Sequence, residues 1–449
     1  MSQQSCKKTA ARRGGWAGMP FALMLILILG LIEPVLARDV PARGRGVAIL
    51  GGRIVTVGPQ GVIAEGSVLI GKNGRIEKIV KGIPRSVPRG YMRVNAKGKW
   101  VTPGIFAAFS RLGVVEISLA RSANDDNVEG GRLHAAFDIS WGVNPRATNI
   151  AINRIAGITR AAVSPARGDD VFAGFGALIH LGIANDIVTK RKAFAVAYLG
   201  DAGAAVAGGA RGSAVVYLVS ALKDARRYAT LPAEAVFDGI VPRVDAEALG
   251  PVVRGEVPLV VHVSRASDMT QLMRLKAELP ALDLVIAGGE EAWLVAGDLA
   301  RARIPVILHP FANLPRNFST LAATQMNAGR LERAGVLFAI ADTEADAHNP
   351  RLIPQYAGNA VTNGLSWAGA IRAITRNPAA IFGVDKDLGS LEAGKIGDVV
   401  VWDGDPLEVT TRPDAVVIAG QLMPMVSRQT ELRDRYRNLK AARPFAYIR

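Results

Sequence analysis

Short apolar runs alternate with stretches of helical periodicity through the middle of the chain, over residues 101–385. The apolar runs predict strands, and helical segments at 268–279 and 290–303 separate the later ones. Such alternation indicates parallel βα units, and about eight of them most commonly close into a barrel. The predicted strands are 104–109, 157–163, 175–181, 257–263, 283–287, 304–308 and 336–341, with less distinct runs at 193–199 and 214–219.

β-Rich segments punctuated by glycine lie near both ends of the chain, at 46–80 and 396–420. Segments of this kind can pair across the chain and leave the middle inserted between them. We therefore predict an α/β fold with a TIM-type (β/α)8 barrel and a small β-sandwich formed by both chain ends. The predicted regions are a signal peptide (1–37), the N-terminal half of the sandwich (38–100), the barrel (101–385), the C-terminal half of the sandwich (386–426) and a tail (427–449). Leu432, Tyr436 and Leu439 have helical spacing and predict that the tail docks as a surface helix.

The first 37 residues have the pattern of a secretory signal. Four basic residues precede an apolar run at 20–32, which is short for a membrane span, and small residues follow at 35–37. We expect export to the periplasm with cleavage of this segment; a retained N-terminal anchor is the alternative. The only cysteine is Cys6, so the mature chain would hold neither a disulfide nor a thiolate ligand.

The formal net charge of +15 raises the question of nucleic-acid binding. The basic residues are scattered, however, and no basic run is interleaved with the aromatic residues that stack on bases. We therefore expect no nucleic-acid partner, and no membrane partner once the signal is removed.

Several motifs give the chain a family resemblance. TRNPAAIFG at 375–383 and DLGSLEAGKIGDVVV at 387–401 resemble the C-terminal signature of the amidohydrolase superfamily, and VTPGI at 101–105 resembles its opening. VVHVSRASD at 260–268 and GGEEAW at 288–293 are similar to imidazolonepropionase-like members. The resemblance runs from about residue 46 to 420. It implies the barrel-and-sandwich fold and hydrolysis of carbon–nitrogen bonds in non-peptide amides or lactams.

The resemblance also implies a metal centre, in which one or two divalent ions, usually zinc, activate water at the C-terminal mouth of the barrel. The family's ligands are a His-x-His pair after the first strand, later histidines on strands five and six, and an aspartate after strand eight. In this chain Phe109 and Arg111 occupy the His-x-His positions, and Ala287 stands in the sixth strand. His262 and Asp342 remain from the family's set. We therefore expect a zinc-type metal to be absent or weakly bound.

No two of the five histidines lie within four residues of each other, so the sequence contains no local chelating pair. The candidate catalytic residues are Asp342 and His262. The candidate substrate-binding residues are Arg265, Arg111 and His309, with loop packing as the alternative role for His309. We expect Arg111 to pair with Asp342 in place of the missing cation.

We expect two groups of acidic residues to have structural and not catalytic roles. Asp125, Asp126 and Glu129 predict a solvated loop face after the first strand, and Glu290 and Glu291 predict a cap on the helix that follows them.

Two functions remain open, and the sequence does not decide whether the chain is an enzyme. One is a divergent hydrolase that uses an unusual or single metal, with Asp342 as proton shuttle and His262 as ligand. The other, which the residues favour, is a metal-free pseudoenzyme that acts as a periplasmic binding or partner subunit. The expected partners are a small-molecule substrate or ligand, a second copy of the chain, or an amidohydrolase subunit.

Overall fold

The computed structural model describes residues 45–232, 234–312, 314–343 and 349–437. The segment expected to be a secretory signal lies outside the described residues. Within them, no single helix is long and apolar enough to cross a bilayer. One sharply bent pair, Gly200–Val206 with Arg211–Tyr228, reaches that length and apolar content only when the two helices are taken together.

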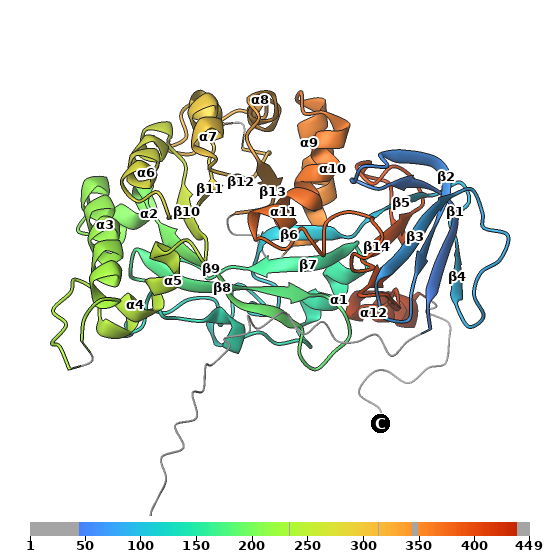
Figure 1. Ribbon diagram of the computed structural model, residues 1–449, viewed down its shortest axis with the longest axis horizontal. Coiled ribbons are helices and arrows are strands. Elements are labelled where there is room, and N and C mark those ends of the chain that lie inside the picture. Colours follow the sequence, from blue (N-terminus) through green and yellow to red (C-terminus); the bar gives the residue numbers. More distant parts are fainter. Residues whose placement is uncertain (1–44, 233, 313, 344–348, 438–449) are drawn as a thin grey trace, which may run out of the picture. The chain divides into compact units, whose positions relative to one another are not determined.

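The middle of the chain forms an eight-stranded sheet whose strands follow one another in sequence order (Figure 1). The first and last of these strands also contact each other, so the sheet is a nearly closed barrel and the predicted TIM-type fold is confirmed. The strands are β6 (Ile105–Ser110), β7 (Ile158–Val163), β8 (Phe172–His180), β9 (Val188–Tyr198), β10 (Leu259–Val263), β11 (Leu284–Gly288), β12 (Val306–Leu308) and β13 (Phe338–Ile340).

The first half of the barrel departs from the predicted series of eight βα units. No helix lies between β7 and β8 or between β8 and β9 in the described chain, and β8 runs antiparallel to both neighbours. Short connections enforce this reversal, because a parallel pair needs a crossover of a dozen or more residues. The other neighbouring pairs are parallel.

Helices cover the barrel wherever a long connection follows a strand (Figure 1). The run 214–219, predicted as a less distinct strand, instead lies in a helix, because Ala214, Leu218 and Ala221 are buried at helical spacing. The helices are α1 (Thr148–Arg154), α2 (Gly200–Val206), α3 (Arg211–Tyr228), α4 (Arg243–Ala248), α5 (Gly250–Val253), α6 (Ala266–Glu278), α7 (Ala296–Ala302), α8 (Asn327–Arg333), α9 (Ile353–Thr362), α10 (Trp367–Ile374) and α11 (Arg376–Ile381). Short 3-10 helices span Arg121–Ala123, Ile139–Trp141, Ala292–Val295 and Pro350–Leu352.

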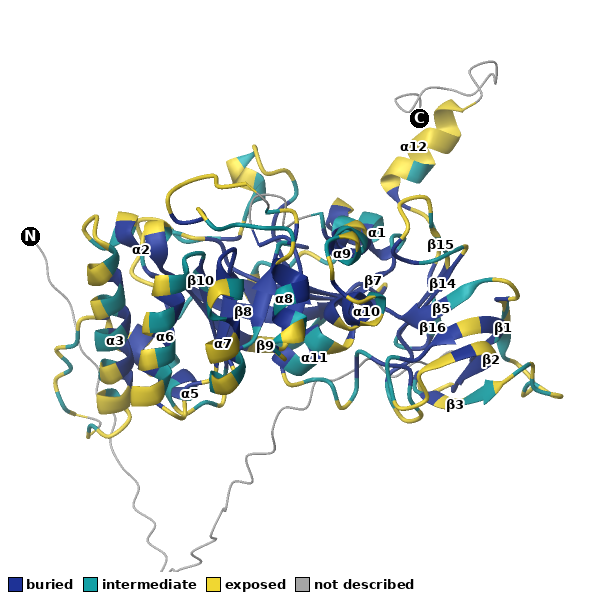
Figure 2. Cartoon of the chain, turned by 90° about the horizontal axis from the view of Figure 1, so that it is seen from above, coloured by how far each residue is buried: buried dark blue, intermediate teal, exposed yellow. Residues whose placement is uncertain are grey.

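Two apolar layers hold the barrel together. The outer layer packs strands against helices, and Figure 2 shows these strands buried beneath helices whose outward faces are exposed. The inner layer consists of alternating strand residues, including Val260, Val285 and Ala339, because successive residues of a strand point to opposite faces. Phe194 and Phe382 pack within this inner layer with their ring centroids 4.8 Å apart. The barrel interior is therefore a packed core.

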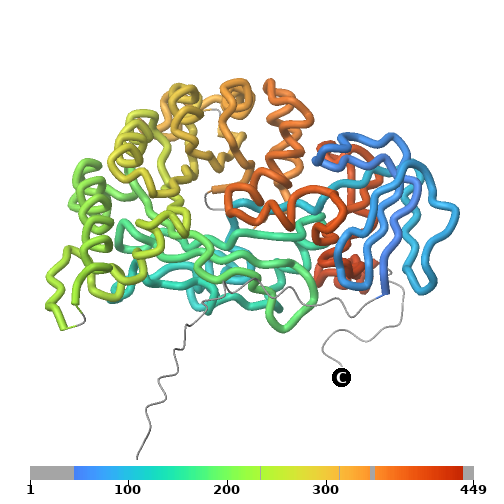
Figure 3. The backbone as a smooth tube through the Cα atoms, viewed as in Figure 1, coloured from blue at the N-terminus to red at the C-terminus, as the bar shows by residue number. Residues whose placement is uncertain are grey.

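Strands from the two chain ends form one sheet, and the blue and red segments lie side by side in Figure 3. The link is an antiparallel pairing of β5 from the N-terminal region with β14 from the C-terminal region. Its members are β1 (Val47–Val55), β2 (Val62–Ile70), β3 (Ile76–Lys81), β4 (Met92–Asn95), β5 (Trp100–Pro103), β14 (Val399–Trp402), β15 (Pro413–Ile418) and β16 (Gln421–Leu422). All eight strands belong to one hydrogen-bonded sheet, so the predicted pairing of the N-terminal and C-terminal segments is observed. The predicted two-layer β-sandwich stays a prediction.

A buried ion pair ties the barrel to this end sheet. Arg160 on β7 donates from Nε to Asp398 Oδ2 at 2.6 Å, and the two side chains are 4% and 7% exposed. Asp398 also accepts the backbone N–H of Ala419 at 2.7 Å. These contacts fix the point at which the C-terminal segment enters the end sheet.

The tail begins with the expected helix, α12 (Arg428–Tyr436), which opens on a capping box between Ser427 and Thr430. The predicted docking stripe is wrong where it is described, because Leu432 and Tyr436 are exposed and no residue of α12 is buried. Leu439 lies outside the described residues.

Candidate functional site

The carboxyl ends of the parallel strands meet at one end of the barrel, here called the barrel mouth, which is where this fold places its sites. All five candidate residues from the sequence lie at or just after these strand ends. They are Arg111 after β6, His262 and Arg265 at the end of β10, His309 after β12 and Asp342 after β13.

Phe109 occupies the first of the two positions where the amidohydrolase pattern has histidine. Its side chain is 1% exposed and belongs to the inner apolar layer with Phe106 and Ala108. A phenyl ring offers no lone pair to a metal, so this position now contributes to packing.

Arg111 occupies the second position and is held by the loop that follows β6. Its Nε lies 3.3 Å from Asp126 Oδ2, and the two side chains are 21% and 11% exposed. Burial raises the pKa of the Asp126 carboxyl, while the charge of Arg111 opposes that rise. The expected partner, Asp342, is therefore not the carboxylate with which Arg111 pairs. The interpretation of Asp126 as part of a solvated face is also wrong, because the residue is buried.

Tyr198, at the end of β9, connects Arg111 to His262. Burial raises the pKa of the Tyr198 hydroxyl, and the adjacent guanidinium of Arg111 counteracts this effect. The hydroxyl donates to the carbonyl of Pro165 at 3.3 Å. On its other side the Tyr198 ring stacks on the imidazole of His262, with centroids 5.1 Å apart and planes inclined by 24°. Neither Asp126 nor Tyr198 carried a sequence motif that marked it as part of a site.

His309 and Asp342 follow β12 and β13, the last two strands of the barrel. The His309 ring packs edge-on against Tyr356 at 4.7 Å and contacts Phe311 at 5.9 Å. Its Nε2 is buried without a hydrogen-bond partner among the described residues, so the observed contacts of His309 are those of loop packing. Asp342 is buried, at 7% exposed.

Carboxylates of α6 and of the segment after β11 stabilise the loop after β10. Arg265 donates to Asp268 at 2.6 Å, in the first turn of α6. Glu291 accepts the backbone N–H of Ala266 at 3.0 Å and that of Ala322 at 3.0 Å. Glu291 therefore caps the helix that precedes it, and the prediction that it caps the following helix is wrong.

The described donors at the mouth do not make up the family's metal centre. Zinc sites normally take three or four protein ligands, and no three His, Cys, Asp or Glu side chains among the described residues are placed to hold a metal. A guanidinium is positive at any physiological pH, so Arg111 repels a cation where a histidine would bind it. Glu344, Asp346 and His348 follow Asp342 in sequence and lie outside the described residues.

A cavity of about 490 Å³ opens beside Arg111. The loop after β6 contributes Arg111, Asp126 and Arg121, and the segment after β7 contributes Arg167. Arg121 is paired with Glu129 at 2.6 Å, and the guanidinium of Arg167 has no ion pair among the described residues. The lining therefore holds more positive than negative charge, and its chemistry fits an anion.

Comparison with known proteins finds similarity to amidohydrolases. The model of the amidohydrolase family matches residues 266–425. The amidohydrolase tasK of Hapsidospora irregularis is 23% identical over 390 residues, covering 79% of this chain and 39% of that protein. An imidazolonepropionase of Sphingopyxis alaskensis is 42% identical over 50 residues, which is 11% of this chain and 12% of that one. The chain thus spans less than half the length of tasK.

Solved structures share the fold. An amidohydrolase from Thermotoga maritima superposes with a TM-score of 0.75 at 23% identity, covering 84% of this chain and 99% of its own. A molinate hydrolase superposes with a TM-score of 0.52 at 18% identity, covering 85% and 95%.

Proposed function

Since this chain is a member of the amidohydrolase superfamily, we propose that it binds an anionic small molecule at the barrel mouth without the metal centre of that superfamily. The observation that carries the proposal is the placement of Arg111. A fixed positive charge, held by Asp126 and in contact with Tyr198, stands where the family pattern has a metal ligand.

The guanidinium of Arg111 supplies part of what a metal cation would supply at this position. It neutralises a nearby carboxylate and offers several N–H donors in a planar fork, which suits carboxylate and phosphate groups. Because Arg111 is only partly exposed, its attraction for an anion is less screened than that of a surface arginine. The adjoining cavity supplies room for a ligand of this charge.

A metal-assisted hydrolase is the second candidate, and the family relationship supports a hydrolase. The specific observation in its favour is that His262 and Asp342 are retained at the ends of β10 and β13. The substrate class would be a carbon–nitrogen bond in a non-peptide amide or lactam. This candidate needs further ligands, because the described donors do not complete a metal centre.

The test is ligand binding to the purified mature protein, measured by calorimetry with succinate and inorganic phosphate as probes. Arg111→Met should weaken binding of the better probe by about tenfold or more, which is the usual effect of losing a charge-assisted hydrogen bond. The matched control is Arg301→Met, an exposed arginine on α7 that pairs with Asp298 away from this cavity. Equal binding by the wild type and Arg111→Met would contradict the proposal.

We further propose a periplasmic location after removal of residues 1–37. Cell fractionation and N-terminal sequencing of the mature chain test this. A chain that retains residue 1 in the membrane fraction would favour the N-terminal anchor instead.

A further inference from the structure

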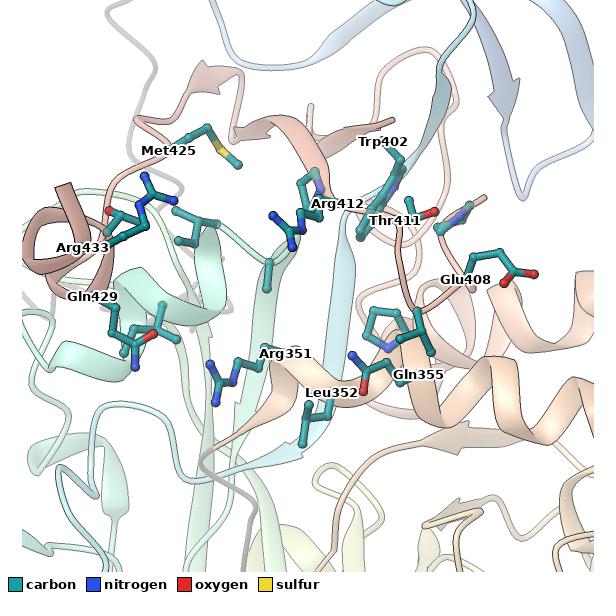
Figure 4. Close-up of a pocket in the computed structure, with 18 residues that line it drawn as sticks. Arg351, Leu352, Gln355, Trp402, Glu408, Thr411, Arg412, Met425, Gln429 and Arg433 are labelled. Carbon is teal, nitrogen blue, oxygen red and sulfur yellow. The ribbon is translucent and has the colours of Figure 1, made fainter. Parts of the chain in front are cut away.

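A second cavity, of about 570 Å³, shares no lining residue with the cavity beside Arg111. It lies where α1, the start of α9, the connection from β14 to β15 and α12 come together (Figure 4). Its lining residues are Ile152, Ile155, Ala156, Arg351, Leu352, Pro354, Gln355, Trp402, Pro406, Glu408, Val409, Thr411, Arg412, Pro413, Met425, Gln429, Thr430 and Arg433.

Three arginines from separate segments surround this cavity. Arg351 comes from the 3-10 helix before α9, Arg412 immediately precedes β15, and Arg433 lies on α12. Figure 4 shows their side chains around the same gap. Among the described residues that line the cavity, Glu408 is the only carboxylate, so the positive charges outnumber the negative ones.

The guanidinium groups of Arg351 and Arg412 have no ion pair or hydrogen bond within the described part of the chain. Both residues are nevertheless fixed through their backbones. The Arg351 N–H donates to Asn153 Oδ1 at 2.7 Å, and the Arg412 N–H donates to Asp403 Oδ1 at 2.8 Å. The positions of the two residues are therefore set while their charged ends remain available. Arg433 differs, because it pairs with its neighbour Asp434 at 2.7 Å.

The cavity also has an apolar wall. Ile152 and Ile155 at the end of α1 and the Trp402 ring contribute to it. The indole is held in place because its Nε1 donates to Thr102 Oγ1 at 2.9 Å. An apolar wall beside unpaired guanidiniums matches a ligand that has an apolar body and one oxyanionic group.

We propose that this cavity is a second ligand site, which binds a small amphiphile through a carboxylate or phosphate group at Arg351 and Arg412 and an apolar body against Ile152, Ile155 and Trp402. A guanidinium pair can bind either oxyanion, because both present oxygens that match its fork of donors. The apolar wall then selects ligands that carry a hydrocarbon body over the free ion. The proposal does not depend on the function of the barrel mouth.

The experiment is calorimetry on the whole mature protein with three probes: octanoate, inorganic phosphate and octanol. Octanoate should bind most tightly, because it alone has both the anion and the apolar body. Arg351→Met and Arg412→Met should each weaken octanoate binding by about tenfold, and raised salt should weaken wild-type binding. Tighter binding of phosphate than of octanoate would overturn the role of the apolar wall.

Two control variants distinguish binding in this cavity from binding elsewhere on the protein. Arg428→Met removes an exposed arginine on α12 that does not line the cavity, so octanoate binding should be unchanged. In an Arg111→Met background, which removes the anion site proposed at the barrel mouth, Arg351→Met should weaken octanoate binding by the same factor. Octanoate binding in the Arg111→Met, Arg351→Met, Arg412→Met triple variant that is as tight as in Arg111→Met alone, with the same melting temperature, would overturn the proposal.

Discussion

The two halves of the barrel contribute differently to the mouth. From β10 to β13 each strand is followed by helix, and His262 and Asp342 remain at the strand ends. From β6 to β9 one strand is reversed, and Phe109, Arg111 and Tyr198 occupy the strand ends. The barrel thus keeps its fold with no metal-binding side chain at these positions of the first half, because the apolar layers that hold it together run through both halves.

The largest expected effect comes from breaking the attachment of the first half to the end sheet. Asp398→Ala should lower the free energy of unfolding by about 3–5 kcal/mol, because it leaves Arg160 charged and buried without its partner. Urea denaturation measures this change. Asp298→Ala, which removes an exposed pair on α7, should leave the midpoint unchanged. A similar loss in both variants would show that the buried pair has no special role.

His180 on β8 should make the first half sensitive to acid. Its Nδ1 accepts the N–H of Gly182 at 3.0 Å, which requires a neutral ring. Burial, assisted by the charge of Arg160, lowers the pKa of His180 from 6.5 to about 4. Between these values the unfolded chain binds a proton that the folded chain does not, so stability falls as the pH drops.

We expect protonation of His180 to lower the free energy of unfolding by about 3 kcal/mol as the pH falls from near 7 to near 4. It is measured as the difference in pH dependence between wild type and His180→Gln, which cancels the contribution of other groups. Identical pH profiles would show that His180 is protonated in the folded protein as readily as in the unfolded one.

At the mouth itself, Arg111→Met should lower the free energy of unfolding by about 1–3 kcal/mol near neutral pH, because Asp126 is then buried without a cation. The double variant Arg111→Met, Asp126→Asn should recover most of this loss. Thermal melting of the wild type, both single variants and the double variant gives the coupling between the two residues. Additive losses would contradict the pairing.

The smallest expected effect concerns the second half. Glu291→Gln should lower the free energy of unfolding by about 1 kcal/mol. Glu291 accepts hydrogen bonds from backbone N–H groups of two separate segments, and an amide oxygen accepts such bonds less strongly than a carboxylate. Chemical denaturation detects this. A loss as large as that of Asp398→Ala would mean that the two halves depend equally on charged contacts.

The sequence was sufficient to predict the barrel and the link between the chain ends, because strand periodicity and the motif at 387–401 are local signals. It did not predict that β8 is antiparallel to its neighbours, because an apolar run does not indicate whether the strand pairs in parallel or antiparallel orientation. The pairing of Arg111 with Asp126 was missed for a different reason. It joins a strand end to a loop residue whose acidic neighbours are typical of a solvated surface. The cavity lined by Arg351 and Arg412 brings together distant segments and leaves no motif.

Elemental analysis of the mature protein, expressed with zinc and then dialysed, tests most directly whether Arg111 has replaced the metal centre. We expect much less than one zinc, iron or manganese ion per chain, with no change in His262→Ala or Asp342→Ala. Near-stoichiometric metal that is lost in either variant would contradict the replacement.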